Sequence, residues 1–309
     1  MKTTQLNRTI NNKFNSRPAR SLRSRIGIGF ALAAAVVCGL APRAHAKTLV
    51  AGPPLVQVAA GNTQVWGRDG AGNVYQYSGG TFNLIGGLYK QVAVGLNDDV
   101  WVLGLKGHAF QWDASTKTFI EVSSTLAFKQ LATGKGGTWA ITSSGDIYSY
   151  NQPLNKFEKF AKGPPPAALE IFVGGAGQAV WILDFGQEPH LYNTRTGFFD
   201  LVTGINLQQI AVGYSDTWGL DFSGQPRLYH PSKPFAFNVV PSVPLTQLAL
   251  TTESELWAIS EADQAIYHYN TITKAFDLED DKELYVQITA GNSTIGVWAL
   301  TNTHKIYKF

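Results

Sequence analysis

This sequence predicts an all-β fold, a seven-bladed β-propeller built from four-stranded antiparallel blades. Seven tryptophans recur at a nearly constant spacing, and each lies between the same two kinds of apolar segment. No stretch of the exported part shows the helical period of apolar side chains. A lone four-stranded meander leaves one face poorly buried, so units of this kind stack around an axis and cover one another.

The tryptophans set the period of the repeat. They are separated by between 35 and 42 residues, and each is followed by a short apolar segment such as VWVLG (100–104) or TWAIT (138–142). A period near 40 residues with several strands in each unit is typical of propellers. We assign all seven to the structural core, because a large aromatic ring fills the space between twisted blades. They are Trp66, Trp101, Trp139, Trp181, Trp218, Trp257 and Trp298.

The remaining strands of each unit follow from the residues around the tryptophan. The first strand is apolar and ends in small residues, as in YKQVAVG (89–95) and LQQIAVG (207–213), which suits a crowded position near the axis. The third strand carries an aromatic residue, and the fourth carries a phenylalanine after a polar turn. The third-strand aromatics are Tyr75, Phe110, Tyr148, Tyr192, Tyr229, Tyr267 and Tyr307.

The two ends of the domain are expected to meet in one blade. The last unit, 283–309, ends after its aromatic strand, and residues 47–50 supply a spare strand at the other end. Pairing the two completes the seventh blade and removes exposed sheet edges without a disulfide. Six blades with an irregular remainder is the alternative.

Residues 1–46 have the composition of an export signal. Seven basic residues and no acid precede the apolar run IGIGFALAAAVVCGLA (26–41), and Ala44-His45-Ala46 provides an A-x-A cleavage site. The run is short of the ~20 residues that a membrane helix needs. We expect cleavage after Ala46, a secreted or periplasmic domain at 47–309, and no membrane span in the mature chain. A retained membrane anchor is the alternative.

Removal of residues 1–46 changes the sign of the net charge of the chain. The full chain has 25 basic and 22 acidic residues, but residues 1–46 hold eight of the bases and no acid, which leaves a net charge of −5. A mildly acidic domain gives no reason to expect nucleic acid as a partner. The single cysteine also leaves with the signal, so the mature domain has no disulfide.

The units resemble tectonin repeats. The residues that carry the resemblance are GLNDDVW (95–101), GKGGTW (134–139) with GDIY (145–148), and GYSDTW (213–218), and it extends over 55–309. Thr251 replaces the glycine in the sixth unit. The resemblance implies a propeller that serves either as a secreted glycan-binding lectin or as a protein-interaction module.

The turn before each tryptophan is the main candidate for a ligand site. Asn, Asp, Ser and Gly are what tight turns require for backbone reasons, and carboxylates occur in only about half of the copies. The functional alternative is a ring of polar sites on one rim that bind sugar hydroxyls. The candidate residues are Asn62, Asn97, Asp98, Asp99, Tyr214, Asp216 and Asn292, together with Trp112, which lies outside the repeated frame and is expected to be partly exposed.

Enzyme signatures do not occur. The histidines of the mature part lack metal-ligand spacing, there is no Gly-x-Ser-x-Gly, and no cysteine remains to act as a nucleophile. Asp280-Asp281 is expected to lie in a solvated turn. We therefore expect no catalytic residue, no cofactor and no metal, and a carbohydrate partner bound multivalently.

Two other functions stay open. A protein-interaction scaffold would use a distinctive patch, for which FGQEP (185–189) and PSKPFAF (231–237) are candidates. An enzyme acting on glycans would need two carboxyl groups from different blades to converge.

Overall fold

The computed structural model describes residues 45–160, 166–175, 179–231 and 236–309. The chain divides into two compact units, Met1–Ala41 and Pro42–Phe309, and every described residue belongs to the second. Of the expected signal segment only His45 and Ala46 are described, and the candidate patch 231–237 is described only in part. Within the described ranges, no helix has the length and apolar character to cross a membrane.

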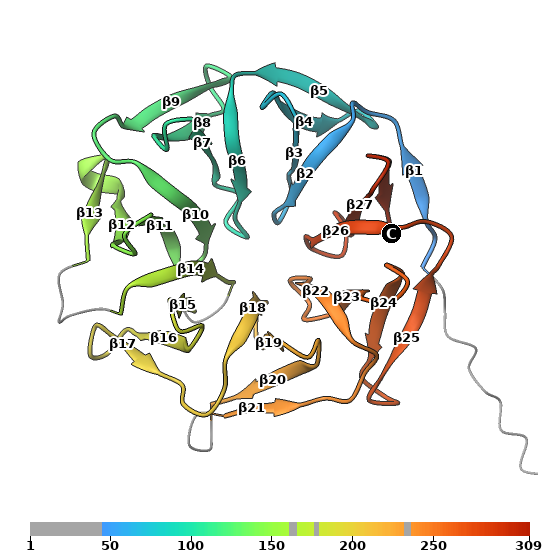
Figure 1. Cartoon of the computed structure of the whole chain (residues 1–309). Coiled ribbons are helices and arrows are strands. Elements are labelled where there is room, and N and C mark those ends of the chain that lie inside the picture. The colour runs from blue at the N-terminus through green and yellow to red at the C-terminus, as the bar shows by residue number, and fades with distance from the viewer. Residues whose placement is uncertain (1–44, 161–165, 176–178, 232–235) are drawn as a thin grey trace, which may run out of the picture. The chain divides into compact units, whose positions relative to one another are not determined.

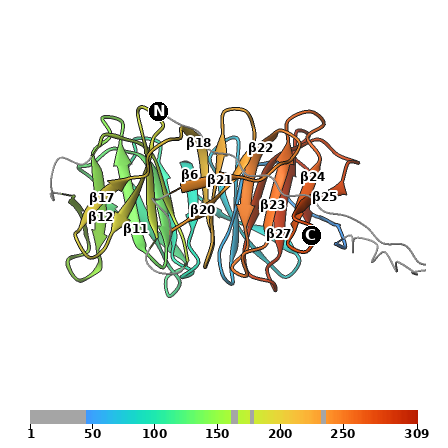
Figure 2. The same ribbon diagram turned by 90° about the horizontal axis from the view of Figure 1, so that it is seen from below.

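Seven four-stranded antiparallel sheets surround a common axis, one for each tryptophan repeat (Figure 1). The predicted seven-bladed propeller is therefore confirmed. The strands run between the two faces of the ring (Figure 2). The described residues contain one turn of 3-10 helix, η1 (Gln152–Leu154).

The innermost strands line the axis. They are β2 (Leu55–Ala60), β6 (Tyr89–Val94), β10 (Phe128–Gly134), β14 (Ala168–Val173), β18 (Leu207–Val212), β22 (Leu245–Leu250) and β26 (Tyr285–Ala290). The second strands carry the tryptophans. They are β3 (Val65–Asp69), β7 (Val100–Gly104), β11 (Gly137–Thr142), β15 (Val180–Asp184), β19 (Thr217–Asp221), β23 (Leu256–Ser260) and β27 (Val297–Thr301).

The third and fourth strands form the outside of each blade. The third strands are β4 (Val74–Ser78), β8 (Ala109–Asp113), β12 (Ile147–Asn151), β16 (Pro189–Asn193), β20 (Pro226–His230), β24 (Ile266–Asn270) and β28 (Ile306–Lys308). The outermost strands are β5 (Thr81–Gly86), β9 (Thr118–Ser123), β13 (Lys156–Lys159), β17 (Phe198–Leu201), β21 (Ala236–Val239), β25 (Ala275–Asp280) and, in the last blade, β1 (Thr48–Val50).

We number the blades 1 to 7 from β2–β5 to the sheet of β26, β27, β28 and β1, and call the contact between neighbouring blades a seam. Each sheet is a meander in sequence order apart from β1. The turns after first and third strands therefore lie on one face of the ring, the rim face. The turns after second strands and the links between blades lie on the opposite face.

The ring is closed by the N-terminal strand, as the sequence predicts. β1 pairs antiparallel with β28, with Thr48 opposite Lys308 and Val50 opposite Ile306. One expectation is wrong here: Asp280 is the last residue of β25 and accepts bonds from Lys47 Nζ at 2.7 Å and Tyr285 Oη at 2.6 Å. The strand that closes the ring brings Lys47 to this carboxylate, so Asp280 lies in a contact between blades rather than in solvent.

In blades 4 and 5 the third strand carries its tyrosine as predicted, but two residues further along than in blade 1. Trp66 pairs with Gln76, and Trp181 pairs with Leu191. Tyr192 is therefore equivalent to Tyr77 and not to Tyr75. A displacement of two residues keeps the side chain on the same face of the sheet but moves it along the strand, and this position decides what the tyrosine contacts.

The same displacement occurs at Tyr229, because Trp218 pairs with Leu228. The positions equivalent to Tyr75 are taken by His190 and Arg227. These bind Asp184 at 3.1 Å and Asp221 at 2.8 Å, as Tyr75 binds Asp69 at 3.0 Å in blade 1. In blades 4 and 5 the hydrogen bond to the aspartate is therefore kept, although a histidine or an arginine replaces the tyrosine that makes it in blade 1.

A ring of glutamine side chains joins the innermost strands. The amide of Gln91 accepts from Leu131 N at 3.0 Å and donates to Leu131 O at 2.8 Å in the next blade. The equivalent glutamines bind the same backbone position in the next blade; they are Gln57, Gln130, Gln209, Gln247 and Gln287. Blade 4 has Glu170 at this position.

A second ring of small residues lets the inner strands converge. A Cβ on Gly134 would lie 2.6 Å from Gly174 O in the next blade, and one on Gly61 would lie 2.6 Å from Gly95 O. Glycine is therefore required at these two points, where an inner strand meets the backbone of its neighbour. Blade 6 has the buried Thr251 at the equivalent position, whose hydroxyl accepts from Glu255 N at 3.0 Å inside its own turn.

The repeated tryptophans fill the seams. All seven are at most 7% exposed, and each packs against an aromatic ring of the next blade. The Trp101 and Tyr150 rings lie 4.7 Å apart edge to face, and Trp298 contacts Tyr77 at 4.6 Å across the closing seam. Such pairs add about 0.5–1.5 kcal/mol each to the effect of burial.

Candidate ligand-binding sites

The turns that precede the tryptophans, so far as the structure describes them, lie on the rim face. Several of their polar side chains bind the turn of a neighbouring blade. Asp98 accepts from Thr63 N at 2.7 Å and from Thr63 Oγ1 at 3.0 Å in the neighbouring blade. Its φ of 62° is a turn conformation that aspartate tolerates better than most residues. Asp98 therefore stabilises the seam between blades 1 and 2.

The neighbours of Asp98 complete the same turn. Asn97 Nδ2 donates to Asp99 Oδ2 at 2.6 Å, and Asp99 O accepts from Gly95 N at 3.0 Å. Burial raises the pKa of Asp99, and the charge of Asp98 adds to the effect. Asn97, Asp98 and Asp99 thus form a hydrogen-bonded turn, which leaves few of their atoms free for a ligand.

The other rim candidates differ in how accessible they are. Asn292 donates to Asn62 Oδ1 at 3.4 Å, which links blade 7 to blade 1. Tyr214 is 48% exposed, and the Lys135 ammonium lies 4.7 Å from its ring centre. Asp216 is half-buried beside it in the same turn. Tyr214 is the rim residue best placed to contact a ligand.

Trp112 lies in a seam and not on the rim. Its ring packs edge-on against Trp66 at 4.9 Å and tilts over Phe119 at 5.1 Å. It is half-buried, in keeping with the expected partial exposure, and it occupies the position of Tyr150 in the next blade. Its main contacts are those of the other seam aromatics.

The indole N–H groups distinguish the seams. Those of Trp66, Trp139 and Trp298 donate to acceptors in the preceding turn, at 3.1, 2.9 and 2.9 Å. Within the described ranges, those of Trp101, Trp181 and Trp257 are buried without a hydrogen-bond partner. Because a buried donor without a partner costs about 1–3 kcal/mol, these seams are the places to look for a ligand.

The seam between blades 4 and 5, the 4–5 seam, contains a pocket of about 480 Å³. Trp181 and Tyr192 line it from blade 4, and Tyr229 lines it from blade 5. The Tyr229 hydroxyl, like the Trp181 indole, is buried with no partner among the described residues. The polar lining consists of Asn193, Thr194, Asp200, Ser215 and Thr217.

The electrostatics of this pocket favour a neutral, hydroxyl-rich ligand. Asp200 accepts from Asn193 Nδ2 at 2.8 Å and keeps its second oxygen for another donor. Burial raises the pKa of Tyr229, and the charge of Asp200 adds to the effect, so the phenol remains a donor at neutral pH. The pocket thus offers donors, an acceptor and aromatic surface together.

The position of Tyr229 in β20 is what forms this pocket. It brings the Tyr229 ring to Trp181 of blade 4, with the ring centres 4.8 Å apart. The sequence analysis did not name Asn193 or Asp200. The pattern Asn-x₆-acid recurs at Asn151–Glu158, Asn193–Asp200 and Asn270–Asp277, and each pair is bonded at 2.8 Å, so a signal was present.

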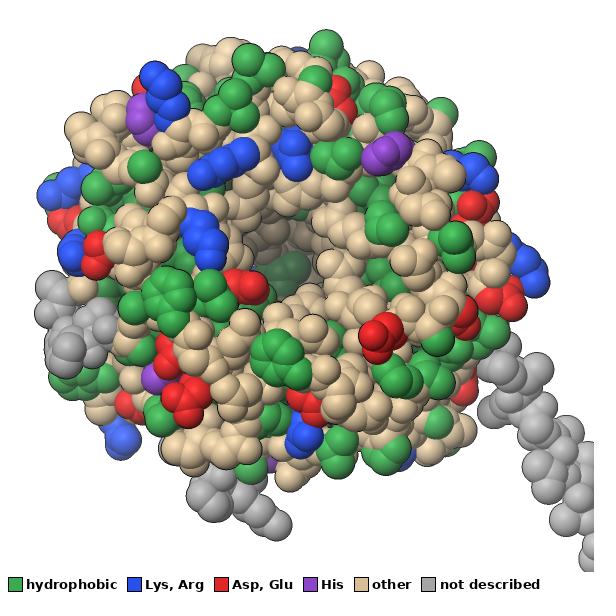
Figure 3. Space-filling view, viewed as in Figure 1, with side chains coloured by type: hydrophobic (Ala, Val, Ile, Leu, Met, Phe, Trp, Pro, Cys, Tyr) green, Lys and Arg blue, Asp and Glu red, His purple; other side chains and the backbone are tan. Residues whose placement is uncertain are grey.

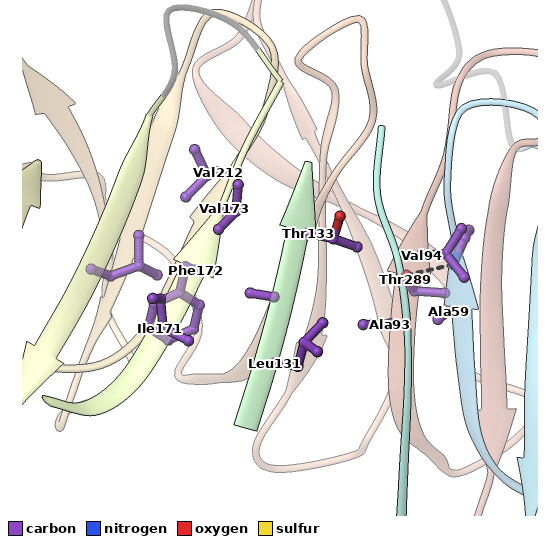
Figure 4. A pocket seen from close by; sticks show the side chains of 13 residues that line it. Ala59, Ala93, Val94, Leu131, Thr133, Ile171, Phe172, Val173, Val212 and Thr289 are labelled. Atoms are coloured by element: carbon purple, nitrogen blue, oxygen red, sulfur yellow. Dashed lines mark hydrogen bonds between the residues drawn. The ribbon is translucent and has the colours of Figure 1, made fainter. Parts of the chain in front are cut away.

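The hollow at the centre of the ring (Figure 3) leads to an axial cavity of about 260 Å³. Its lining is mostly apolar and comes from the innermost strands, including Ala59, Leu131 and Phe172 (Figure 4). Thr133 and Thr289 add hydroxyl groups. Because the described lining holds no carboxylate, we do not propose an ion in this channel.

One cluster of potential metal ligands exists among the described residues. Donor atoms of His45, His268 and Glu279 lie within 4.8 Å of one another. His45 Nδ1 is 3.3 Å from Glu279 Oε1, and His268 Nδ1 is 3.8 Å from it. His45 precedes the expected cleavage site, so the set is complete only in the uncleaved chain. We therefore retain the expectation of no metal in the mature domain.

The fold is that of a seven-bladed β-propeller whose blades resemble tectonin repeats. The tectonin domain model matches residues 54–162, that is, blades 1 to 3, so the resemblance to tectonin repeats is confirmed. No curated protein matches the chain.

Solved structures resemble the fold at low identity. The β-propeller domain of Cps50 (Swd1) from Myceliophteria thermophila has a TM-score of 0.66 at 10% identity and covers 84% of this chain and 98% of that one. YCF48 from Cyanidioschyzon merolae has a TM-score of 0.65 at 14% identity over 86% and 98%. Virginiamycin B lyase from Staphylococcus aureus has a TM-score of 0.66 at 11% identity over 85% and 97%. A fold shared by such different proteins does not assign a function, which must come from the site.

Proposed function

We propose that this chain is an exported, non-catalytic, lectin-like propeller that binds surface glycans or polysaccharide. The pocket in the 4–5 seam is the observation that carries the proposal. It combines three aromatic side chains with two buried donors that have no partner in the described chain. A pocket of about 480 Å³ lies within the range of small-ligand sites.

Sugar chemistry matches this lining. The apolar face of a sugar ring packs on aromatic side chains, while its hydroxyl groups accept from N–H and O–H donors and donate to carboxylates. Trp181 and Tyr229 supply the donors, and Asp200 supplies the acceptor. A ligand hydroxyl that reaches the two donors removes the cost of leaving them unpaired.

A second groove supports multivalent binding. It has a volume of about 400 Å³, lies around His45, and contains Asn270 and Asp277, the equivalents of Asn193 and Asp200. Cleavage after Ala46 removes His45 and frees this groove. Two weak sites on one rigid ring raise the avidity for a repeating polysaccharide without any new contact.

The basic and apolar order of residues 1–46 supports export to the periplasm or the cell exterior. N-terminal sequencing of protein recovered from an exporting host is expected to give Lys47 as the first residue. A chain that keeps residues 1–46 would contradict the export proposal.

The test of sugar binding is a glycan and polysaccharide array probed with residues 47–309. Asp200→Asn is expected to lower the affinity about tenfold, because it replaces the acceptor of a charge-assisted hydrogen bond. Glu158→Gln changes the same Asn–acid pair in blade 3, outside the pocket, and is the matched control. Absence of binding by the folded domain, or an equal effect of both variants, would reject this assignment.

A protein-interaction function is the second candidate, and exposed apolar side chains on the opposite face favour it. Leu88, Leu105 and Phe222 are each more than 60% exposed, and Phe185 of the predicted patch is 56% exposed. Partner capture that Phe185→Ser with Phe222→Ser abolishes, while sugar binding is unchanged, would support this function instead.

A further inference from the structure

Glu170 is the one departure from the glutamine ring. In the other blades the glutamine amide accepts from the backbone N–H of the next inner strand, and in five of them it also donates to the same residue's carbonyl. The equivalent residue for Glu170 is Ile210 in blade 5. A carboxylate can accept from Ile210 N–H but cannot donate to Ile210 C=O, because it carries no hydrogen. A protonated carboxyl group can do both.

The 4–5 seam shows the consequence. Among the described residues no hydrogen bond joins Glu170 to blade 5, whereas every other seam has its glutamine bond. Two backbone bonds remain in this seam, from Gly175 N to Gly213 O and from Leu207 N to Gln187 O, both at 3.0 Å. β14 and β18 approach each other over a shorter length than any other neighbouring pair of inner strands. This is also the seam that contains the pocket with its unpaired Trp181 and Tyr229 groups.

Few charges surround Glu170. Lys129 on β10 is the cation that acts on it, and this amine also donates to Leu169 O at 2.8 Å. β18 (LQQIAV) and β11 (GTWAIT) contribute no charged side chain, and β15 contributes only Asp184 at its far end. Burial raises the pKa of Glu170, and Lys129 opposes this in part.

We infer that Glu170 is a positioning residue for the seam pocket: its ionised carboxylate leaves the 4–5 seam without the two-way side-chain bond that glutamine forms in the other seams, so that blade 5 separates from blade 4 more readily and admits a ligand to the two buried donors. The inference rests on the proposed sugar-binding function. It goes beyond that function, because it names a residue outside the pocket that sets the affinity and makes it depend on pH.

The direction of the pH effect follows from the raised pKa. The folded protein holds the Glu170 proton more tightly than the unfolded chain does, so the stability that this group contributes is full below the unfolded value near 4.5. It is lost as the pH rises through the folded pKa. In the acid range the protonated Glu170 carboxyl group can bond both the N–H and the C=O of Ile210, as glutamine does in the other seams. Blades 4 and 5 are then held together more tightly, and the affinity for sugar falls.

The experiment compares three forms of residues 47–309: the natural sequence, Glu170→Gln, and Glu170→Gln combined with Gln91→Glu. The double variant has the natural composition but moves the carboxyl group to the seam between blades 2 and 3, where Gln91 binds Leu131. Hydrogen exchange of β14 and β18, the melting temperature, and the affinity for the best array sugar are each measured from pH 4.5 to 8.

Glu170→Gln is expected to raise the melting temperature at pH 7.5 by about 2–4 °C, the size of one or two net hydrogen bonds. It should slow hydrogen exchange in β18. It should also lower the affinity for sugar about fivefold, because a free-energy change of about one net hydrogen bond has an effect of this size on binding. The differences in melting temperature, exchange and affinity between Glu170→Gln and the natural sequence should disappear toward pH 4.5. In the double variant, fast exchange should move to β6 and β10 while the affinity stays low.

Equal exchange of β18 and equal pH profiles in the natural chain and Glu170→Gln would overturn the inference. So would a tighter seam with unchanged affinity. If no form binds sugar but hydrogen exchange of β18 still follows the protonation of residue 170, the proposed sugar-binding function is wrong. The effect of Glu170 on the contact between blades 4 and 5 is then still supported. The two failures are therefore distinguishable.

Discussion

Single atoms decide whether neighbouring blades fit together. Gly134 shows this most clearly, because a Cβ there would meet the Gly174 carbonyl oxygen, a backbone atom that cannot rotate away. Glu170 shows the reverse case, in which one missing hydrogen removes the side-chain bond that glutamine forms in the other seams. The rim aspartates belong to the same class of structural contacts, since Asp98 binds the turn of the next blade.

Gly134→Ala is expected to destabilise the domain by about 2 kcal/mol, because it overpacks the point where β10 meets blade 4. Urea unfolding followed by tryptophan fluorescence measures the change. Gly70→Ala is the control, because its Cβ would meet only Val56 at 3.8 Å. An equal effect of the two substitutions would refute the steric argument.

Asp98→Ala separates the two interpretations of the rim. It removes the bonds to Thr63 and is expected to cost about 1–3 kcal/mol in unfolding free energy; since these bonds are solvent-exposed, the lower end of this range is expected. Sugar affinity at the 4–5 seam should be unchanged. If Asp98→Ala instead abolishes binding by a domain of normal stability, the rim turns are the site.

At the scale of elements, β1 determines whether the ring has a free edge. Its three residues pair with β28, Val50 is buried, and Lys47 reaches Asp280 in blade 6. An unpaired edge strand is a template for association with another chain. The closing strand therefore protects the domain as well as completing the last sheet.

Val50→Ser is expected to destabilise the domain by about 1.5–3 kcal/mol, the value of burying one valine side chain. Thermal unfolding should show a melting temperature lower by about 4–8 °C, since 1 kcal/mol corresponds to about 2–4 °C at this size. Light scattering should show association through β28. Leu49→Ser, at a side chain that is 60% exposed, should change neither, and a comparable loss there would refute the role of closure.

At the scale of the whole molecule, the sequence was sufficient for the architecture because every blade repeats the same pattern. Seven tryptophans and a spare strand determined the blade number and the closure. The seam pocket was not predicted, because it arises from the pairing of blade 4 with blade 5 and from third strands that carry their tyrosine two residues further along than in blade 1. Asp200 can be identified as a ligand-binding candidate only once the structure shows Tyr229 next to Trp181 in the same pocket.

The glutamine ring could have been predicted from the sequence. The same position holds glutamine in six of the seven first strands, and a polar residue at a fixed place in a buried strand needs a partner. What the sequence could not show is that the partner lies in the next blade, about 40 residues on, and that Glu170 therefore affects one seam only.

The crystal structure of residues 47–309 soaked with the best-binding oligosaccharide tests the central claim most directly. We expect sugar density in the 4–5 seam, with one ring against the Trp181 and Tyr229 side chains and a hydroxyl within hydrogen-bond distance of Asp200. Density confined to the rim turns, or an empty seam at a saturating sugar concentration, would contradict it.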